Sequence, residues 1–218
     1  MTKMPPSLCE LQAVFDLWAK SIQEITDQNE CIAFTRKKMP ELLSNRRLFK
    51  QILSGIVGGN RYPDLRQATM FLNEFILYIN SQRLFSARLY IYEPGQYTPI
   101  HDHNSWGVYG CVCGKVEVIR YLRKDDETLQ GFARLEEIDR ILLDPGDTSV
   151  VRPLNDGIHQ AGNPTASTCA MLSVYGTPIR RLFVNQFDLS NNTVSRLYPP
   201  RLRKKRLAAQ ALETLSSQ

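Results

Sequence analysis

Short segments rich in aromatic and β-branched residues follow one another from about residue 69 to residue 175. Turn-forming residues separate them at intervals of about 8–12 residues, a spacing typical of antiparallel sandwiches and barrels. Strands do not alternate with helices along the sequence, as a parallel α/β sheet would require. We therefore expect an all-β barrel. The expected strands are 71–80, 85–93, 107–113, 115–122, 133–138, 148–152 and 169–175.

The first third of the chain is predicted to be helical instead. Ser7 can cap a helix whose apolar residues recur at spacings of three and four. These residues are Leu11, Val14, Phe15, Trp18 and Ile22. Two more helices are expected around 31–36 and 40–53, with Pro40 in a first turn, where its missing N–H would have no partner. The chain then divides into an N-terminal helical segment (1–62) that packs on the barrel, the β-barrel (63–195) and a basic tail (196–218) that we expect to be helical.

The formal net charge of +5 belongs to this tail. From Arg196 onward the chain carries six of its 27 basic and one of its 22 acidic residues, so the rest holds 21 of each and is neutral. No aromatic side chain lies among residues 203–206 to offer nucleic-acid bases a stacking surface. We expect a solvated arm and no nucleic-acid partner.

The cysteines and the hydropathy pattern indicate a cytoplasmic protein without a membrane partner. Five scattered cysteines, an odd number, favour reduced thiols over a disulfide framework. No apolar run reaches the roughly 20 residues that a membrane-spanning helix needs. Residues 1–6 lack the basic-then-apolar pattern of a secretory signal.

The sequence has only three histidines, and their spacing predicts a metal site. In a strand, residues i and i+2 point to the same face, so His101 and His103 project together while Asp102 points away. Two imidazoles on one face can bind one metal ion. The only histidine left to complete the site is His159.

Glycines and a proline around these histidines complete two longer motifs, and both resemble the motifs of the cupin superfamily. The first consists of Gly95, His101, His103 and Gly114, and the second of Gly146, Pro153, Gly157, His159 and Asn163. The resemblance extends over about residues 88–175. It implies a double-stranded β-helix, the jelly-roll barrel of that superfamily.

One position restricts which cupins the chain resembles. Where cupins commonly supply a glutamate ligand, this chain has Gly107 and Val108. A site of three histidines without a carboxylate is similar to that of the thiol dioxygenases. Residues 92–107 resemble the bacterial relatives of cysteine dioxygenase and 3-mercaptopropionate dioxygenase. The family implies Fe(II), a small thiol and O₂ as substrates, and a sulfinic acid as product. Three imidazoles also bind zinc or nickel, so these metals stay open as occupants of the purified protein, and iron is implied by the resemblance alone.

Tyr175 matches the active-site tyrosine of this family, whose phenol is implied to hydrogen-bond bound oxygen or substrate. Gly107 stands where animal cysteine dioxygenases have a cysteine cross-linked to that tyrosine, so this cross-link cannot form. Ser173 and Met171 replace the histidine and serine of the family's Ser-x-His-x-Tyr relay.

A substrate carboxylate calls for a cation, preferably an arginine. Arg88 shares strand parity with Tyr90 and Tyr92, and we expect the three to face the barrel interior. Arg181, shortly after the active-site tyrosine, is the alternative cation. Trp106 is a further candidate for lining the substrate pocket, with packing inside the barrel as the other interpretation.

Two other functions stay open at this point. One is a metal-dependent cupin enzyme acting on a non-thiol substrate, which the altered relay allows. The other is a cupin binding or sensing module without catalysis, whose basic tail contacts a partner. Barrels of this class often pair through edge strands, so a homodimer is an expectation from fold analogy.

Overall fold

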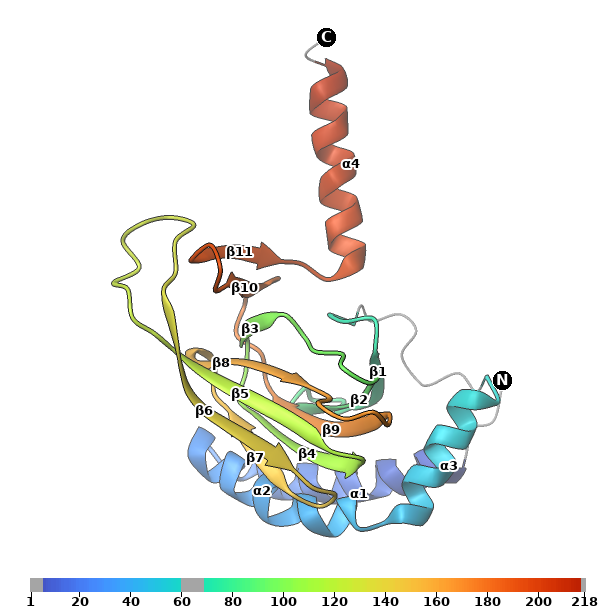
Figure 1. Cartoon of the computed structure of the whole chain (residues 1–218). Helices are drawn as coiled ribbons and strands as arrows, with labels where there is room; N and C mark the ends of the chain where they lie inside the picture. The colour runs from blue at the N-terminus through green and yellow to red at the C-terminus, as the bar shows by residue number, and fades with distance from the viewer. Residues whose placement is uncertain (1–5, 60–68, 217–218) are drawn as a thin grey trace.

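A computed structural model describes residues 6–59 and 69–216 (Figure 1). Three helices come first: α1 (Pro6–Gln23), α2 (Gln28–Leu43) and α3 (Arg46–Val57). Eleven strands follow within the described residues, and α4 (Pro200–Ser216) is the last described element. Among the described residues, no helix is both long and apolar enough to cross a membrane.

The strands form two antiparallel sheets that enclose a barrel interior. The five-stranded sheet has the order β1 (Glu74–Ile79), β2 (Phe85–Tyr92), β9 (Cys169–Gly176), β4 (Gly107–Cys113) and β7 (Thr148–Val151). The six-stranded sheet has the order β11 (Thr193–Leu197), β10 (Val184–Asp188), β3 (Ile100–His103), β8 (Leu154–Gly162), β5 (Val116–Arg123) and β6 (Leu135–Leu143). This arrangement is the double-stranded β-helix with an N-terminal helical layer, so the predicted fold class is confirmed.

Alternation along the strands of the five-stranded sheet separates two cores. Leu89, Val108 and Leu172 face the helices, whereas their neighbours Tyr90 and Tyr109 face the barrel interior and pack with residues of the other sheet. Because successive side chains in a strand point to opposite faces, one sheet serves both cores. The sheet is therefore buried on both sides, and its inner face is shielded from solvent.

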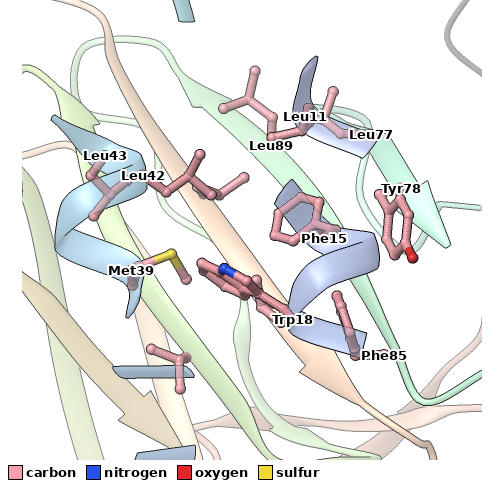
Figure 2. Close-up of a cluster of buried hydrophobic side chains, with 14 of the residues drawn as sticks. Leu11, Phe15, Trp18, Met39, Leu42, Leu43, Leu77, Tyr78, Phe85 and Leu89 are labelled. Atoms are coloured by element: carbon pink, nitrogen blue, oxygen red, sulfur yellow. The ribbon is translucent and has the colours of Figure 1, made fainter. Parts of the chain in front are cut away.

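The outer core joins the helices to the sheet. Phe15 of α1 is fully buried, and its ring centroid lies 5.8 Å from that of Phe85 and 5.2 Å from that of Trp18 (Figure 2). Met39 of α2 extends the same cluster (Figure 2). Burial of one such aromatic side chain contributes about 1.5–3 kcal/mol to folding. The helical layer thus holds the five-stranded sheet in place from behind, opposite the barrel interior.

The helix boundaries differ from the sequence prediction. Pro40 lies inside α2 rather than in the first turn of a later helix, because α2 continues to Leu43 and buries Met39 and Leu42 on its inner face. Asn45, whose side chain accepts from the N–H of Leu48, sets the start of α3. A capping asparagine thus decides this boundary, and the proline does not.

Several strands were missed or shortened in the sequence prediction, namely β8, β10, β11 and the second half of β6. The predicted boundary at 195/196 falls inside β11, which pairs with β10 along its length. The predicted boundary at 62/63 lies outside the described residues. The tail is helical over Pro200–Ser216, and α4 projects away from the barrel (Figure 1).

Candidate metal centre

Strand pairing brings the three histidines together. His101 and His103 lie on β3, and His101 is the register partner of His159 on the antiparallel strand β8. The ring centroids of the three imidazoles are 4.6–5.0 Å apart. All three side chains are buried, with exposed fractions of 5%, 6% and 3% in chain order. The spacing argument for His101 and His103 therefore places both on one interior face, and β8 supplies the third ring.

Backbone carbonyls orient two of these rings. The Nδ1 of His101 lies 2.8 Å from the carbonyl oxygen of Pro99, and the Nδ1 of His103 lies 3.1 Å from that of Gly157. A carbonyl oxygen only accepts, so each Nδ1 carries the proton and each Nε2 presents its lone pair. The close approach of the chain at Gly157 needs a glycine, because a Cβ there would overlap the carbonyl oxygen of Arg152.

The centre of the triad fits a metal ion. The Nε2 of His103 is buried and has no hydrogen-bond partner among the described residues. One ligand atom from each histidine lies within 4.8 Å of the other two. The hydroxyl of Tyr109 lies 3.4 Å from the Nδ1 of His159 and gives the third ring an outer partner. A buried, unpartnered nitrogen facing two other imidazoles is the arrangement that a bound metal satisfies.

The surroundings keep the three imidazoles neutral. Burial lowers the pKa of His101, and burial together with the neighbouring histidines lowers the pKa values of His103 and His159 well below the ordinary value. Neutral imidazoles offer lone pairs to a metal at physiological pH.

A cavity of about 370 Å³ opens beside the histidines. Its polar lining includes His101, His103, Arg88, Tyr90 and Tyr175, and Phe71 and Met70 form part of an apolar wall. The Phe71 ring centroid lies 5.0 Å from that of His101. One side of the candidate metal centre therefore faces a space large enough for a small substrate.

Tyr175 lies between the metal centre and the predicted cation. Its ring is roughly parallel to that of His103, with centroids 5.9 Å apart, and the Arg88 guanidinium carbon lies 5.8 Å from the Tyr175 ring centroid. Burial raises the pKa of Tyr175, although the hydroxyls of Tyr90 and Ser173 act in the opposite direction. The phenol is therefore protonated at neutral pH and can donate a hydrogen bond into the cavity.

Gly107 makes room for this tyrosine. The two residues are register partners on β4 and β9, and a Cβ at Gly107 would lie 2.7 Å from Cδ1 of the Tyr175 ring. A side chain at position 107 would thus press directly against the ring. The match of Tyr175 to an active-site tyrosine stays a prediction.

The structure separates the two arginine candidates. Arg88 lines the cavity, where it forms an ion pair with Glu74. Arg181 instead makes a two-bond pair with Asp102, at 2.9 and 2.6 Å, and also contacts the Asn104 side chain and the His103 carbonyl. Asp102 points away from the metal centre, as expected, but it is fully buried. Arg181 therefore fastens the histidine strand from outside.

The aromatic candidates also divide by position. Tyr90 lines the cavity, whereas Tyr92, the next interior residue of β2, lies in the barrel core with its hydroxyl buried and unpartnered among the described residues. Trp106 packs in the core between sheet and helices, and its indole lies against Gly176. Among the described residues that line the cavity, neither Tyr92 nor Trp106 occurs.

Sequence reasoning missed Glu74, Phe71 and Met70. Glu74 stands in the otherwise apolar strand Glu74–Ile79, and a lone acid in such a strand is a signal that could have been used. Its pairing with Arg88 depends on the register of β1 against β2, which the sequence does not display. The position of Phe71 over His101 depends on the loop before β1 and carried no sequence signal.

Solved structures that resemble this chain include cupin-domain proteins. One is a Cupin 2 conserved barrel domain protein from Salinispora arenicola, at 18% identity over 53% of this chain and 86% of that chain, with a TM-score of 0.36. Another, from Klebsiella pneumoniae, is described by its double-stranded β-helix domain and matches at 13% identity over 65% and 93% of the chains, with a TM-score of 0.36.

An oxalate decarboxylase from Lactobacillus farciminis matches at 21% identity over 70% of this chain and 38% of that chain, with a TM-score of 0.36. At these identities the similarity is one of fold. No protein-family model matches the sequence.

Proposed function

We propose that the protein is an iron-dependent dioxygenase that adds both atoms of O₂ to the sulfur of a small thiol and releases the sulfinic acid. The observation that carries the proposal is the carboxylate-free triad of His101, His103 and His159 beside a cavity that also holds a protonated phenol and a guanidinium. The reaction RSH + O₂ → RSO₂H balances without a further reductant.

The three imidazoles would hold Fe(II) through their Nε2 atoms. A ferrous ion held there would supply a lowered pKa for the substrate thiol and open positions for the thiolate and O₂. Because all three imidazoles are neutral, they would leave the +2 charge of Fe(II) uncompensated, and this charge would favour a thiolate ligand.

Arg88 is the residue proposed to bind a substrate carboxylate. Its side chain is one-quarter exposed, lines the cavity and lies on the same strand face as Tyr90. Arg181 is committed to Asp102, so it is not available for this role. A carboxylate held by Arg88 places a two- or three-carbon thiol between the guanidinium and the histidines, and it fixes the orientation of the sulfur.

Tyr175 is proposed to donate a hydrogen bond to the substrate or to the oxygen atoms added to it. The phenol stays protonated because burial raises its pKa. Tyr90 and Ser173 act on that pKa in the opposite direction, and burial outweighs them. Met70 and Phe71 form part of the cavity wall, and the Phe71 ring contacts that of His101.

A second function is favoured by one observation, the replacement of the relay histidine by the buried Ser173. That change suits a metal-dependent enzyme of the same fold that acts on a non-thiol substrate. The two functions differ in whether O₂ uptake depends on a thiol.

The test is O₂ uptake by iron-loaded protein with cysteine, 3-mercaptopropionate and cysteamine, together with mass spectrometry of the product. We expect uptake with at least one thiol, one sulfinic acid per O₂ consumed, and loss of both in His101→Ala. Uptake that persists unchanged in His101→Ala, or iron-loaded protein inactive on every thiol, contradicts the proposal.

A further inference from the structure

Glu74 holds two parts of the cavity at once. Its side chain has no exposed surface. Oε1 accepts from the Arg88 guanidinium, and Oε2 accepts from the backbone N–H groups of Met70 and Phe71 at 2.7 and 3.2 Å. One buried carboxylate therefore joins the cavity's cation to the loop that forms its apolar wall.

The register of β1 and β2 explains how this bridge forms. Glu74 is the partner of Tyr90, and Arg88 is the partner of Ile76 on the same strand pair. Glu74 and Arg88 are thus diagonal neighbours on the interior face, within reach of long side chains. The loop before β1 folds back over the carboxylate, which places Phe71 against His101.

The bridge leaves part of Arg88 for a ligand. Nη1 bonds to Glu74 and Nε lies 3.4 Å from the Ser86 hydroxyl, whereas Nη2 has no acceptor within the part of the chain that the structure describes. A guanidinium fixed at Nη1 and Nε presents Nη2 in one direction. Holding it so lowers the entropy lost when a carboxylate binds.

We propose that Glu74 is a positioning residue for substrate specificity: through its bridge to Arg88 and to the Met70–Phe71 wall, it makes the cavity prefer small thiols that carry a carboxylate over small neutral thiols. This inference rests on the proposed function for the identity of the substrate as a thiol. It adds that a carboxylate in the protein, itself out of contact with the substrate, sets the preference.

Glu74→Gln should break one of the two contacts, either that with Arg88 or that with the loop, because an amide has one acceptor oxygen and one NH₂ where the carboxylate has two acceptors. If the amide oxygen keeps the loop N–H groups, its NH₂ faces the Arg88 donors. If it keeps Arg88, the loop is released. A matched control is Glu10→Gln, which alters a carboxylate that accepts from Arg47 and Asn45 in the helical layer, away from the cavity.

The experiment is calorimetric titration of iron-loaded protein without O₂, using 3-mercaptopropionate and the neutral 2-mercaptoethanol. We expect wild type to prefer 3-mercaptopropionate. In Glu74→Gln its dissociation constant should rise about tenfold, while that of 2-mercaptoethanol should change less than about twofold. In an Arg88→Met background, Glu74→Gln should have no further effect on 3-mercaptopropionate. Glu10→Gln should bind both thiols as wild type does.

An equal loss for both thiols indicates a merely structural role and overturns the proposal, as does an unchanged preference in Glu74→Gln. A wild type that binds 3-mercaptopropionate no better than 2-mercaptoethanol, or not at all, also contradicts it. Turnover is measured separately in the presence of O₂. A protein that shows the Glu74-dependent preference but forms no sulfinic acid refutes the dioxygenase and leaves the positioning role supported.

Discussion

Gly107→Ala tests whether the position of Tyr175 matters, because this one added methyl group meets the ring directly. The new Cβ would lie 2.7 and 2.8 Å from two ring carbons of Tyr175 and 2.8 Å from Cγ1 of Val151. Carbon atoms in favourable contact are about 3.5–4.0 Å apart, so the ring or the strand must move by about 1 Å.

Overpacking of this kind costs about 1–3 kcal/mol of folding stability. For a chain of this length, each kcal/mol lowers the melting temperature by about 2–4 °C, so Gly107→Ala should lower it by about 2–12 °C. A displacement of about 1 Å in a reacting group costs up to about 100-fold in rate. We therefore expect thiol turnover to fall by 10- to 100-fold, on the order of that limit. Metal content should not change, because the three histidines lie on β3 and β8.

Thermal unfolding, metal analysis and O₂ uptake measure these three effects. Gly58→Ala is the matched control, because its φ is −74° and the added Cβ would lie 3.4 Å or more from its neighbours. In a Tyr175→Ala background, Gly107→Ala should be less destabilising by about 1 kcal/mol, since the ring is gone. Wild-type stability and turnover in Gly107→Ala would show that the added Cβ does not displace the Tyr175 ring.

Three further predictions concern the supports of the site and of the barrel. Tyr109→Phe removes the outer partner of His159 and should weaken metal affinity about 10-fold, measured by competition with a chelator; unchanged affinity would show that the contact does not support the ligand. Asp102→Asn breaks the buried pair with Arg181 and should cost about 3 kcal/mol in chemical denaturation; a cost below about 1 kcal/mol, the range of an exposed pair, contradicts it. The pKa of Asp125 is lowered to about 2, mainly because the Arg123 guanidinium donates hydrogen bonds to its carboxylate. Its stabilisation is therefore present above about pH 4 and lost as the pH falls toward 2, so Asp125→Asn should be destabilised by about 1–2 kcal/mol at pH 7 and should differ little from wild type near pH 2. A stability difference that does not change with pH would contradict this assignment.

The fold and the grouping of the three histidines could be predicted because they depend on local patterns. Alternation in the strands and turn residues at regular intervals indicate a barrel, and a His-x-His pair with one remaining histidine leaves one choice of ligand set. The histidine triad does not depend on knowing loop conformations. His101 and His159 are brought together by a strand pairing that the fold itself requires.

The rest of the cavity could not be predicted because it depends on register and loops. Strand parity placed Arg88 and Tyr90 on the interior face correctly, but it could not show that Tyr92, of the same parity, lies too deep to line the cavity. Arg181 follows Tyr175 closely in sequence, yet the turn after β9 directs it to Asp102. Arg181 is drawn away from the cavity by the buried carboxylate of Asp102 on β3, and no pattern in the sequence indicates this contact.

The histidine triad is proposed to support the transfer of both oxygen atoms of O₂ to a thiol. The most direct measurement is mass spectrometry of the product formed by iron-loaded protein under ¹⁸O₂ with 3-mercaptopropionate or cysteine. Wild type should form a sulfinic acid that carries two labelled oxygen atoms, and His101→Ala should form none. A product without labelled oxygen, such as a disulfide, or an equal yield from His101→Ala contradicts this proposal.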